Sequence, residues 1–172
     1  MTGRTGRYGR RVGLLVGPAL FVSAAAACGP APARFDAKPY AGRYEGTWSH
    51  EPGGTSGAVV VDIRPSAKVA AATVVVDLGG NVLGTGDPPP TELTALLDGE
   101  VATVQRGTVV LGQVAFEIRQ DGTISGTNSE FSRGTMGALS CEGRITTSRL
   151  EVVCTGRDDP ATVMAVRADH VS

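Results

Sequence analysis

The sequence has few of the residue types that metal binding, acid–base catalysis and ring stacking require. It contains two histidines and one tryptophan, and only 5% of its residues are aromatic. His50 lies in a glycine-rich turn and His170 lies near the C-terminus, so we expect both side chains to be solvated. Neither is flanked by a nucleophile motif. We therefore expect no catalytic residues, no bound metal and no cofactor, and an enzyme is the least favoured class of function.

The chain also lacks an apolar run long enough to span a membrane comfortably. Its N-terminal run, residues 12–22, is shorter than the roughly 20 residues of a spanning helix and is broken by glycine and proline. Four arginines precede this run, and small residues follow it at 23–27. That order predicts a secretory signal peptide over residues 1–27. The Arg10–Arg11 pair leaves twin-arginine export open, but its flanking residues fit that motif poorly and favour ordinary secretion.

A cysteine follows the small residues directly. The sequence Ala25-Ala26-Ala27-Cys28 resembles the bacterial lipobox, in which small residues precede a cysteine that is acylated on sulfur and becomes the mature N-terminus. The resemblance implies a lipoprotein with a diacylglyceryl (palmitate-type) anchor on Cys28, held on the extracytoplasmic side of the cell membrane. Two acyl chains suffice for stable anchoring. The alternative is a plain cleaved signal peptide with an incidental cysteine beside it.

The charge balance excludes several partners. Removal of residues 1–27 leaves 172 − 27 = 145 residues, with 16 − 4 = 12 basic and 17 acidic side chains. A net charge near −5 argues against nucleic acid and against electrostatic attachment to anionic lipid. Membrane association is therefore expected to depend on the anchor at Cys28. Residues 28–38, rich in proline and alanine, are expected to form a tether to a single domain at 39–172.

The remaining two cysteines predict a disulfide. With Cys28 acylated, Cys141 and Cys154 form an even pair in an oxidising compartment. The surrounding sequence indicates two strands about a turn at Thr147-Ser148. In an antiparallel hairpin, the residue numbers of every directly opposed pair add up to the same value. The turn residues give 147 + 148 = 295 and the cysteines give 141 + 154 = 295, so the two cysteines are directly opposed. We predict a structural bridge across the hairpin; the spacing does not fit a C-x-x-C redox site.

From residue 40 onward, short alternating segments are separated by glycine, proline and aspartate. This pattern is typical of antiparallel strands. We predict an all-β fold, an antiparallel up-and-down barrel of about eight to ten strands, with a long strand at 108–120 and a last strand at 161–167. Residues 91–99 fit either a short helix or a hairpin turning at Asp98-Gly99, and the hairpin is slightly favoured.

The first strand carries a weak family resemblance. Tyr44-Glu45-Gly46-Thr47-Trp48 resembles the G-x-W element that opens lipocalin-like and other calycin barrels. The resemblance implies a lipocalin-like barrel in which Trp48 packs at one end, against a basic residue of the last strand such as Arg167, in a cation–π contact. Read without the resemblance, Trp48 is a core aromatic of a β-sandwich. The chain also resembles the small glycine-, alanine- and valine-rich lipoproteins of actinobacteria.

The inward faces of the predicted strands are aliphatic. We predict that they line a barrel interior that binds or carries an apolar small molecule or lipid at the cell envelope. The alternative is a structural or protein-interaction module with a filled core, acting through its loops. The candidate lining residues are Trp48, Val59, Val61, Val74, Val76, Phe116, Leu139 and Met164.

Overall fold

The structure is a computed structural model, and it describes residues 34–51, 53–82, 86–108, 112–129 and 138–172. The chain divides into two compact units, Met1–Ala31 and Pro32–Ser172, and every described residue belongs to the second. The predicted signal peptide at 1–27 and the predicted acylation site at Cys28 lie outside the described residues. Within the described part, no helix is long and apolar enough to cross a membrane.

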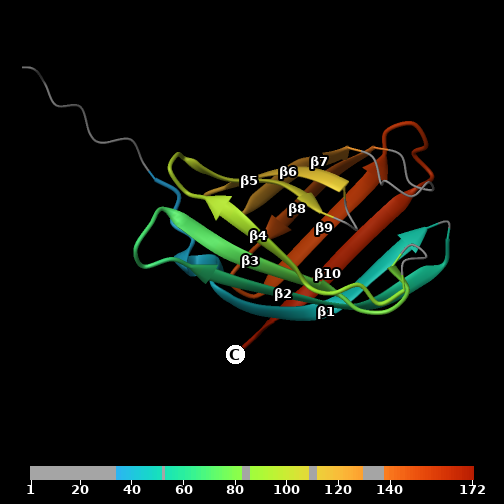
Figure 1. Cartoon of the computed structure of the whole chain (residues 1–172), viewed down its shortest axis with the longest axis horizontal. Helices are drawn as coiled ribbons and strands as arrows, with labels where there is room; N and C mark the ends of the chain where they lie inside the picture. The colour runs from blue at the N-terminus through green and yellow to red at the C-terminus, as the bar shows by residue number, and fades with distance from the viewer. Residues whose placement is uncertain (1–33, 52, 83–85, 109–111, 130–137) are drawn as a thin grey trace, which may run out of the picture. The chain divides into compact units, whose positions relative to one another are not determined.

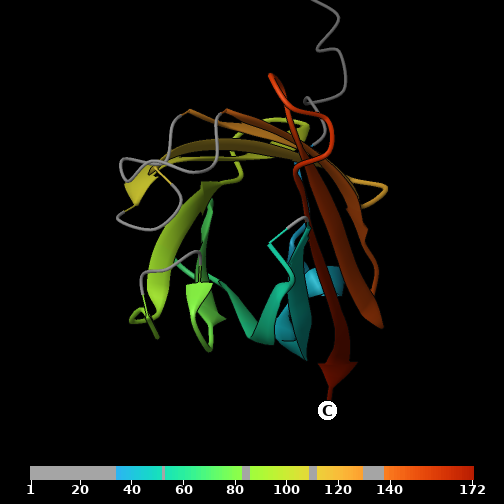
Figure 2. The same ribbon diagram turned by 90° about the vertical axis from the view of Figure 1, so that its right-hand side faces the viewer.

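The described chain folds into ten antiparallel strands in a closed barrel (Figure 1). Each strand pairs with its neighbours in sequence, and β10 pairs with β1 to close the ring that Figure 2 shows. The predicted up-and-down barrel is confirmed, with the strand number at the upper end of the expected range. The strands are β1 Gly42–Glu51, β2 Thr55–Pro65, β3 Ala71–Leu78, β4 Thr91–Leu96, β5 Val101–Thr108, β6 Gly112–Arg119, β7 Thr123–Ser129, β8 Leu139–Ile145, β9 Arg149–Gly156 and β10 Val163–Val171.

The register fixes the width of the barrel. If directly opposed residues are followed from His50 through β10, β9 and onward around the barrel to β2, the path ends on Pro65. The β2 residue directly opposite His50 is Thr55. One circuit of the barrel therefore shifts the register by 65 − 55 = 10 residues, and we call this shift the stagger. With a strand spacing of about 4.8 Å and a rise of about 3.3 Å per residue, ten strands with this stagger tilt by about 35° around a radius of about 9 Å. This interior is wider than that of an eight-stranded barrel.

Three segments differ from their predicted form. Residues 91–99 belong to a hairpin, the form that the sequence favoured over a helix. Its loop is the four-residue segment 97–100 rather than a two-residue turn at Asp98-Gly99, and Gly99 does not adopt a positive φ. The predicted long strand at 108–120 begins instead at Gly112, where φ is 65°, and its residues 109–111 lie outside the described part. The last strand extends to Val171, because residues 163–171 pair with Arg43–Glu51 of β1.

The segment before β1 covers one end of the barrel. It ends in a 3-10 helix, η1 (Lys38–Tyr40), and its apolar Phe35 is buried although it lies in the predicted tether. The Phe35 N–H donates to the Gly99 carbonyl oxygen at 2.8 Å, and the Tyr40 hydroxyl donates to the Gln120 carbonyl oxygen at 2.6 Å. Both acceptors belong to loops at the same end, after β4 and β6. We call this end, covered by residues 35–40, the covered end.

Candidate functional site: an apolar cavity inside the barrel

Side-chain alternation places aliphatic residues on the inner face of nearly every strand. Because successive residues of a strand point to opposite faces, β2 turns Val59, Val61 and Ile63 inward, and all three are buried. Charged side chains lie outside; the ion pair between Arg149 and Asp169, for example, has both partners more than half exposed. The interior of the barrel is therefore lined mainly by apolar side chains, and the charged side chains face the solvent.

These inner faces do not meet completely, and they leave a cavity of about 190 Å³ inside the barrel. A completely filled core, the alternative raised by the sequence, does not match this packing. Asn128 is the one polar side chain in the described lining, and its Oδ1 accepts a hydrogen bond from the Leu139 N–H at 2.6 Å. The lining residues are Val59, Val61, Ile63, Val74, Val76, Leu78, Leu93, Val104, Val114, Phe116, Ile118, Ile124, Asn128, Leu139, Cys141, Ile145, Leu150, Val152, Cys154, Met164 and Val166.

The size of the cavity suits a small ligand. A dry apolar cavity of about 150 Å³ is large enough to hold a benzene ring, and a water molecule takes about 30 Å³ of a liquid. By these measures the cavity has room for a molecule of about six to eight non-hydrogen atoms, or for part of a larger one if side chains shift. Such sites hold their ligands mainly by apolar contact.

The predicted lining residues fall in two groups. Seven of the eight border the cavity: Val59, Val61, Val74, Val76, Phe116, Leu139 and Met164. Trp48, the eighth, faces inward and is fully buried but does not border the cavity. Its ring packs on Gly57, directly opposite in β2, and its indole N–H donates to the Gly79 carbonyl oxygen at 3.0 Å.

The predicted cation–π contact of Trp48 with Arg167 is wrong. Arg167 is directly opposite Thr47, and both side chains are on the exposed outer face of the barrel. Trp48 is on the inner face, opposite Val166. The inner partner of the indole is a backbone carbonyl rather than a cation.

Cys141 and Cys154 form a disulfide across β8 and β9, directly opposed with their Cα atoms 3.9 Å apart. The predicted register is confirmed. Both cysteines are among the residues that line the cavity. The bridge therefore fixes the spacing of two strands that form the cavity wall.

The covered end of the barrel has buried tyrosines. The Tyr44 hydroxyl has two carbonyl oxygens as acceptors for its one proton, that of Thr146 at 3.0 Å and that of Tyr40 at 3.2 Å. Burial raises the pKa of Tyr44 above its ordinary value, with a smaller contribution from Tyr40. The ring of His170 packs edge-on against Tyr44, with centroids 5.1 Å apart. His170 is therefore a packing residue of this end and not the solvated residue that the sequence predicted.

The opposite end has polar side chains on its inner face that sequence reasoning missed. His50 continues the inward series of Tyr44 and Trp48 in β1, and it is directly opposite Thr55 in β2 and Met164 in β10. The expectation of a solvated His50 is wrong, since its Nε2 atom is buried. The alternation of β1 continues from Trp48 to His50, whereas the glycines that follow His50 favour a turn. The strand extends to Glu51.

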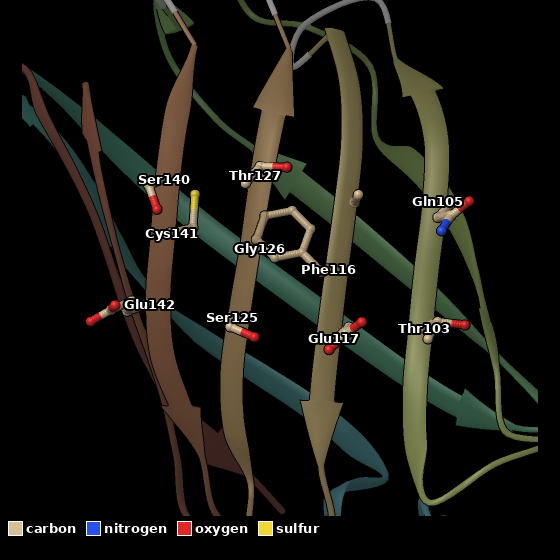
Figure 3. Close-up of a pocket in the computed structure, with 11 residues that line it drawn as sticks. Thr103, Gln105, Phe116, Glu117, Ser125, Gly126, Thr127, Ser140, Cys141 and Glu142 are labelled. Atoms are coloured by element: carbon tan, nitrogen blue, oxygen red, sulfur yellow. The ribbon is translucent and has the colours of Figure 1, made fainter. Parts of the chain in front are cut away.

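A second hollow, of about 390 Å³, lies on the outer face of β5–β8 (Figure 3). Its exposed lining includes Gln105, Glu117 and Glu142, and it is polar where the inner cavity is apolar. The ring of Phe116 lies beside the β7 backbone at Gly126, where an added Cβ would come within 2.2 Å of it. The part of the chain that the structure describes has no group of three or more His, Cys, Asp or Glu side chains placed to hold a metal. The apolar inner cavity is the stronger candidate site.

Comparison with known proteins identifies no family: no family model, no curated protein and no solved structure matches the chain.

Proposed function

We propose that this chain is an exported, lipid-anchored binding protein that holds a small apolar molecule inside its barrel at the cell envelope. The observation that carries the proposal is the cavity of about 190 Å³, whose described lining is aliphatic, aromatic or sulfur-containing except for Asn128. An apolar cavity in a folded protein is open to an apolar ligand because filling it restores lost contacts without desolvating a charge. Export and acylation at Cys28 rest on the sequence from Arg4 to Cys28.

The lining chemistry supports binding of apolar groups. At about 25 cal/mol per Å² of apolar surface removed from water, a ligand that buries about 200 Å² gains roughly 5 kcal/mol before the cost of association is subtracted. Even before that cost, about 5 kcal/mol corresponds to a dissociation constant of roughly 0.2 mM, so a ligand of this size binds weakly and a larger one, admitted when side chains shift, binds more tightly. A ligand that brings a net charge into this interior would find no opposite charge in the described lining.

Two adjacent valines provide a matched test of the cavity. Val152 lines the cavity, whereas Val153, its neighbour in β9, is 43% exposed on the outer face. Val152→Phe adds volume inside the cavity, and Val153→Phe adds the same volume outside. The rise in melting temperature caused by saturating toluene or p-xylene measures binding, since a ligand of the folded state stabilises it.

We expect the wild type and Val153→Phe to be stabilised equally by either compound, and Val152→Phe to lose at least tenfold in affinity. Equal stabilisation of all three proteins would place binding outside the cavity. No stabilisation of the wild type by any small apolar compound would refute the proposed function.

A further inference from the structure

At the end of the barrel opposite the covered end, the inner face has two buried polar atoms without a partner among the described residues. They are His50 Nε2 and Thr55 Oγ1. The two residues are directly opposite each other in β1 and β2, so their side chains are on the same face as Trp48 and Val59. A buried polar group without a hydrogen bond destabilises the folded state, and two in one place are unusual in a folded protein.

This polar pair adjoins the apolar cavity. His50 is directly opposite Met164 in β10, and Met164 lines the cavity. Directly opposed residues have Cβ atoms about 4.5–5.5 Å apart, so the Met164 side chain is a neighbour of both the pair and the cavity. Along β1 and β2, the Trp48 ring on Gly57 lies between the pair and Val59. Methionine has three rotatable bonds and adapts its shape to its neighbours. A ligand that extends from the cavity to the pair would therefore pass along β10, with Met164 in a different rotamer.

The chemistry of the pair selects one kind of ligand group. A threonine hydroxyl both donates and accepts, and an imidazole nitrogen does one or the other according to its tautomer. A ligand hydroxyl can donate to one member and accept from the other at once, whichever tautomer His50 adopts. A carboxylate can only accept and an ammonium can only donate, and the described cavity lining offers neither ion a counter-charge.

We propose that the cavity takes a neutral apolar molecule with one hydroxyl group, and that His50 and Thr55 bind this hydroxyl. This proposal rests on the proposed function, because it requires the apolar part of the ligand to occupy the cavity. It goes further by naming the head group of the ligand and the two residues that recognise it. The apolar lining then sets affinity, and the polar pair sets orientation and selects against hydrocarbons of the same shape.

The test pairs p-cresol with p-xylene, which have the same shape and differ by a hydroxyl in place of a methyl group. Dissociation constants for both are measured by titration calorimetry on the full chain, refolded without detergent and with its disulfide formed. The variants are Thr55→Val and His50→Leu. The matched control is Thr47→Val, which makes the same change on the exposed outer face of β1.

Each of Thr55→Val and His50→Leu should raise the ratio of the p-cresol to the p-xylene dissociation constant about five- to tenfold, the effect of one net hydrogen bond. Thr47→Val should leave the ratio unchanged. The ligand-free Thr55→Val protein should be at least as stable as the wild type, because a hydroxyl without a partner is removed.

The outcomes separate this proposal from the one on which it rests. If p-xylene binds and neither variant changes the ratio, recognition of a hydroxyl by the pair is wrong and the apolar cavity remains a binding site. If neither compound binds the wild type, both proposals are overturned. A loss of stability in ligand-free Thr55→Val would show that the hydroxyl already has a partner within the protein, and it would also overturn the head-group site.

Discussion

At the scale of single residues, Gly57 is where the barrel wall makes room for its one tryptophan. A Cβ at Gly57 would lie 2.0 Å from the Gly79 carbonyl oxygen and 2.6 Å from Trp48 Nε1. These are the two atoms of the Trp48–Gly79 hydrogen bond. The requirement for glycine here arises from close approach of the ring and backbone, since Gly57 is not among the positive-φ glycines.

We therefore expect Gly57→Ala to lower the free energy of unfolding by about 2–3 kcal/mol, as overpacking of a core usually does. Gly99→Ala is the matched control, because an added Cβ there meets nothing within 4 Å and Gly99 has no positive φ. It should be neutral or stabilising by up to about 1 kcal/mol. Urea denaturation of both variants measures the difference; equal stabilities would mean that the ring does not pack on Gly57.

The sequence predicted which residues face inward better than it predicted what they touch. Strict alternation placed Val59, Val61, Val74 and Val76 on the inner face, because a strand has only two faces and the core takes the apolar one. It could not separate Trp48, which packs on the wall, from residues that border the cavity. That distinction depends on which glycine is opposite the ring, which is decided by the pairing of strands.

At the scale of elements, the disulfide connects β8 and β9 across 13 positions of sequence. A closed loop of this length should contribute about 3 kcal/mol by restricting the unfolded chain. We expect the double variant Cys141→Ala/Cys154→Ala to lose about this much in urea denaturation, and its stability to be insensitive to reductant.

Wild-type protein treated with reductant serves as the control for the substitutions, and its stability should fall by a similar amount. Mass mapping without reductant should link the two cysteine peptides. Two free thiols in the oxidised protein would contradict the bridge.

The covered end of the barrel makes stability dependent on pH in the alkaline range. Burial raises the pKa of Tyr44 above that of an unfolded tyrosine, so the folded state holds the phenol proton more tightly. This contribution is fully present below the unfolded pKa of about 10 and is lost as pH rises from there through the folded pKa. Tyr44→Phe should cost about 1–2 kcal/mol at pH 7, where the hydrogen bonds to the Thr146 and Tyr40 carbonyls are lost.

The same variant should also weaken the fall of stability above pH 10. Chemical denaturation at pH 8, 9, 10 and 11 measures the slope for both proteins. An identical alkaline slope in wild type and Tyr44→Phe would show that Tyr44 does not titrate differently in the folded and unfolded states.

Elements with strong local signals were predictable, and those defined by distant partners were not. The β8–β9 hairpin was predictable from its two strand-like segments, and its register agreed with the positions of the two cysteines. Strand β5 (Val101–Thr108) has little alternation in its sequence VATVQRGT, and its bounds are determined by pairing with β4 and β6. The extension of β10 to Val171 depends on pairing with β1, about 120 positions away in sequence, which no local pattern reports.

At the scale of the whole molecule, closure by β1 and β10 is what creates an interior. Every described strand has a neighbour on both sides, although β4 and β5 pair at only two positions, Ala95–Val104 and Leu96–Thr103. The stagger of ten residues over ten strands gives a lumen that small valine and alanine side chains do not fill. The fold class could be predicted from patterning, but the number of strands and their stagger, which set the cavity, could not.

The anchor at Cys28 is a prediction about the whole molecule that a single substitution tests. Cys28→Ala should move the protein from the membrane fraction to the soluble fraction, because its net charge of about −5 after processing gives no other attraction to anionic lipid. The double variant Cys141→Ala/Cys154→Ala keeps Cys28 and should remain with the membrane. Retention of Cys28→Ala in the membrane fraction would contradict a lipid anchor at this cysteine.

The most direct test of an occupied barrel is native mass spectrometry of wild-type protein and Val152→Phe, purified side by side and gently from the same envelope. We predict that the wild type has an additional mass that extracts into organic solvent, and that Val152→Phe, whose cavity is filled, does not. The extracted compound should be neutral and should contain a hydroxyl group if His50 and Thr55 bind its head. A bare wild-type mass, or the same additional mass on both proteins, would contradict a ligand held in the cavity.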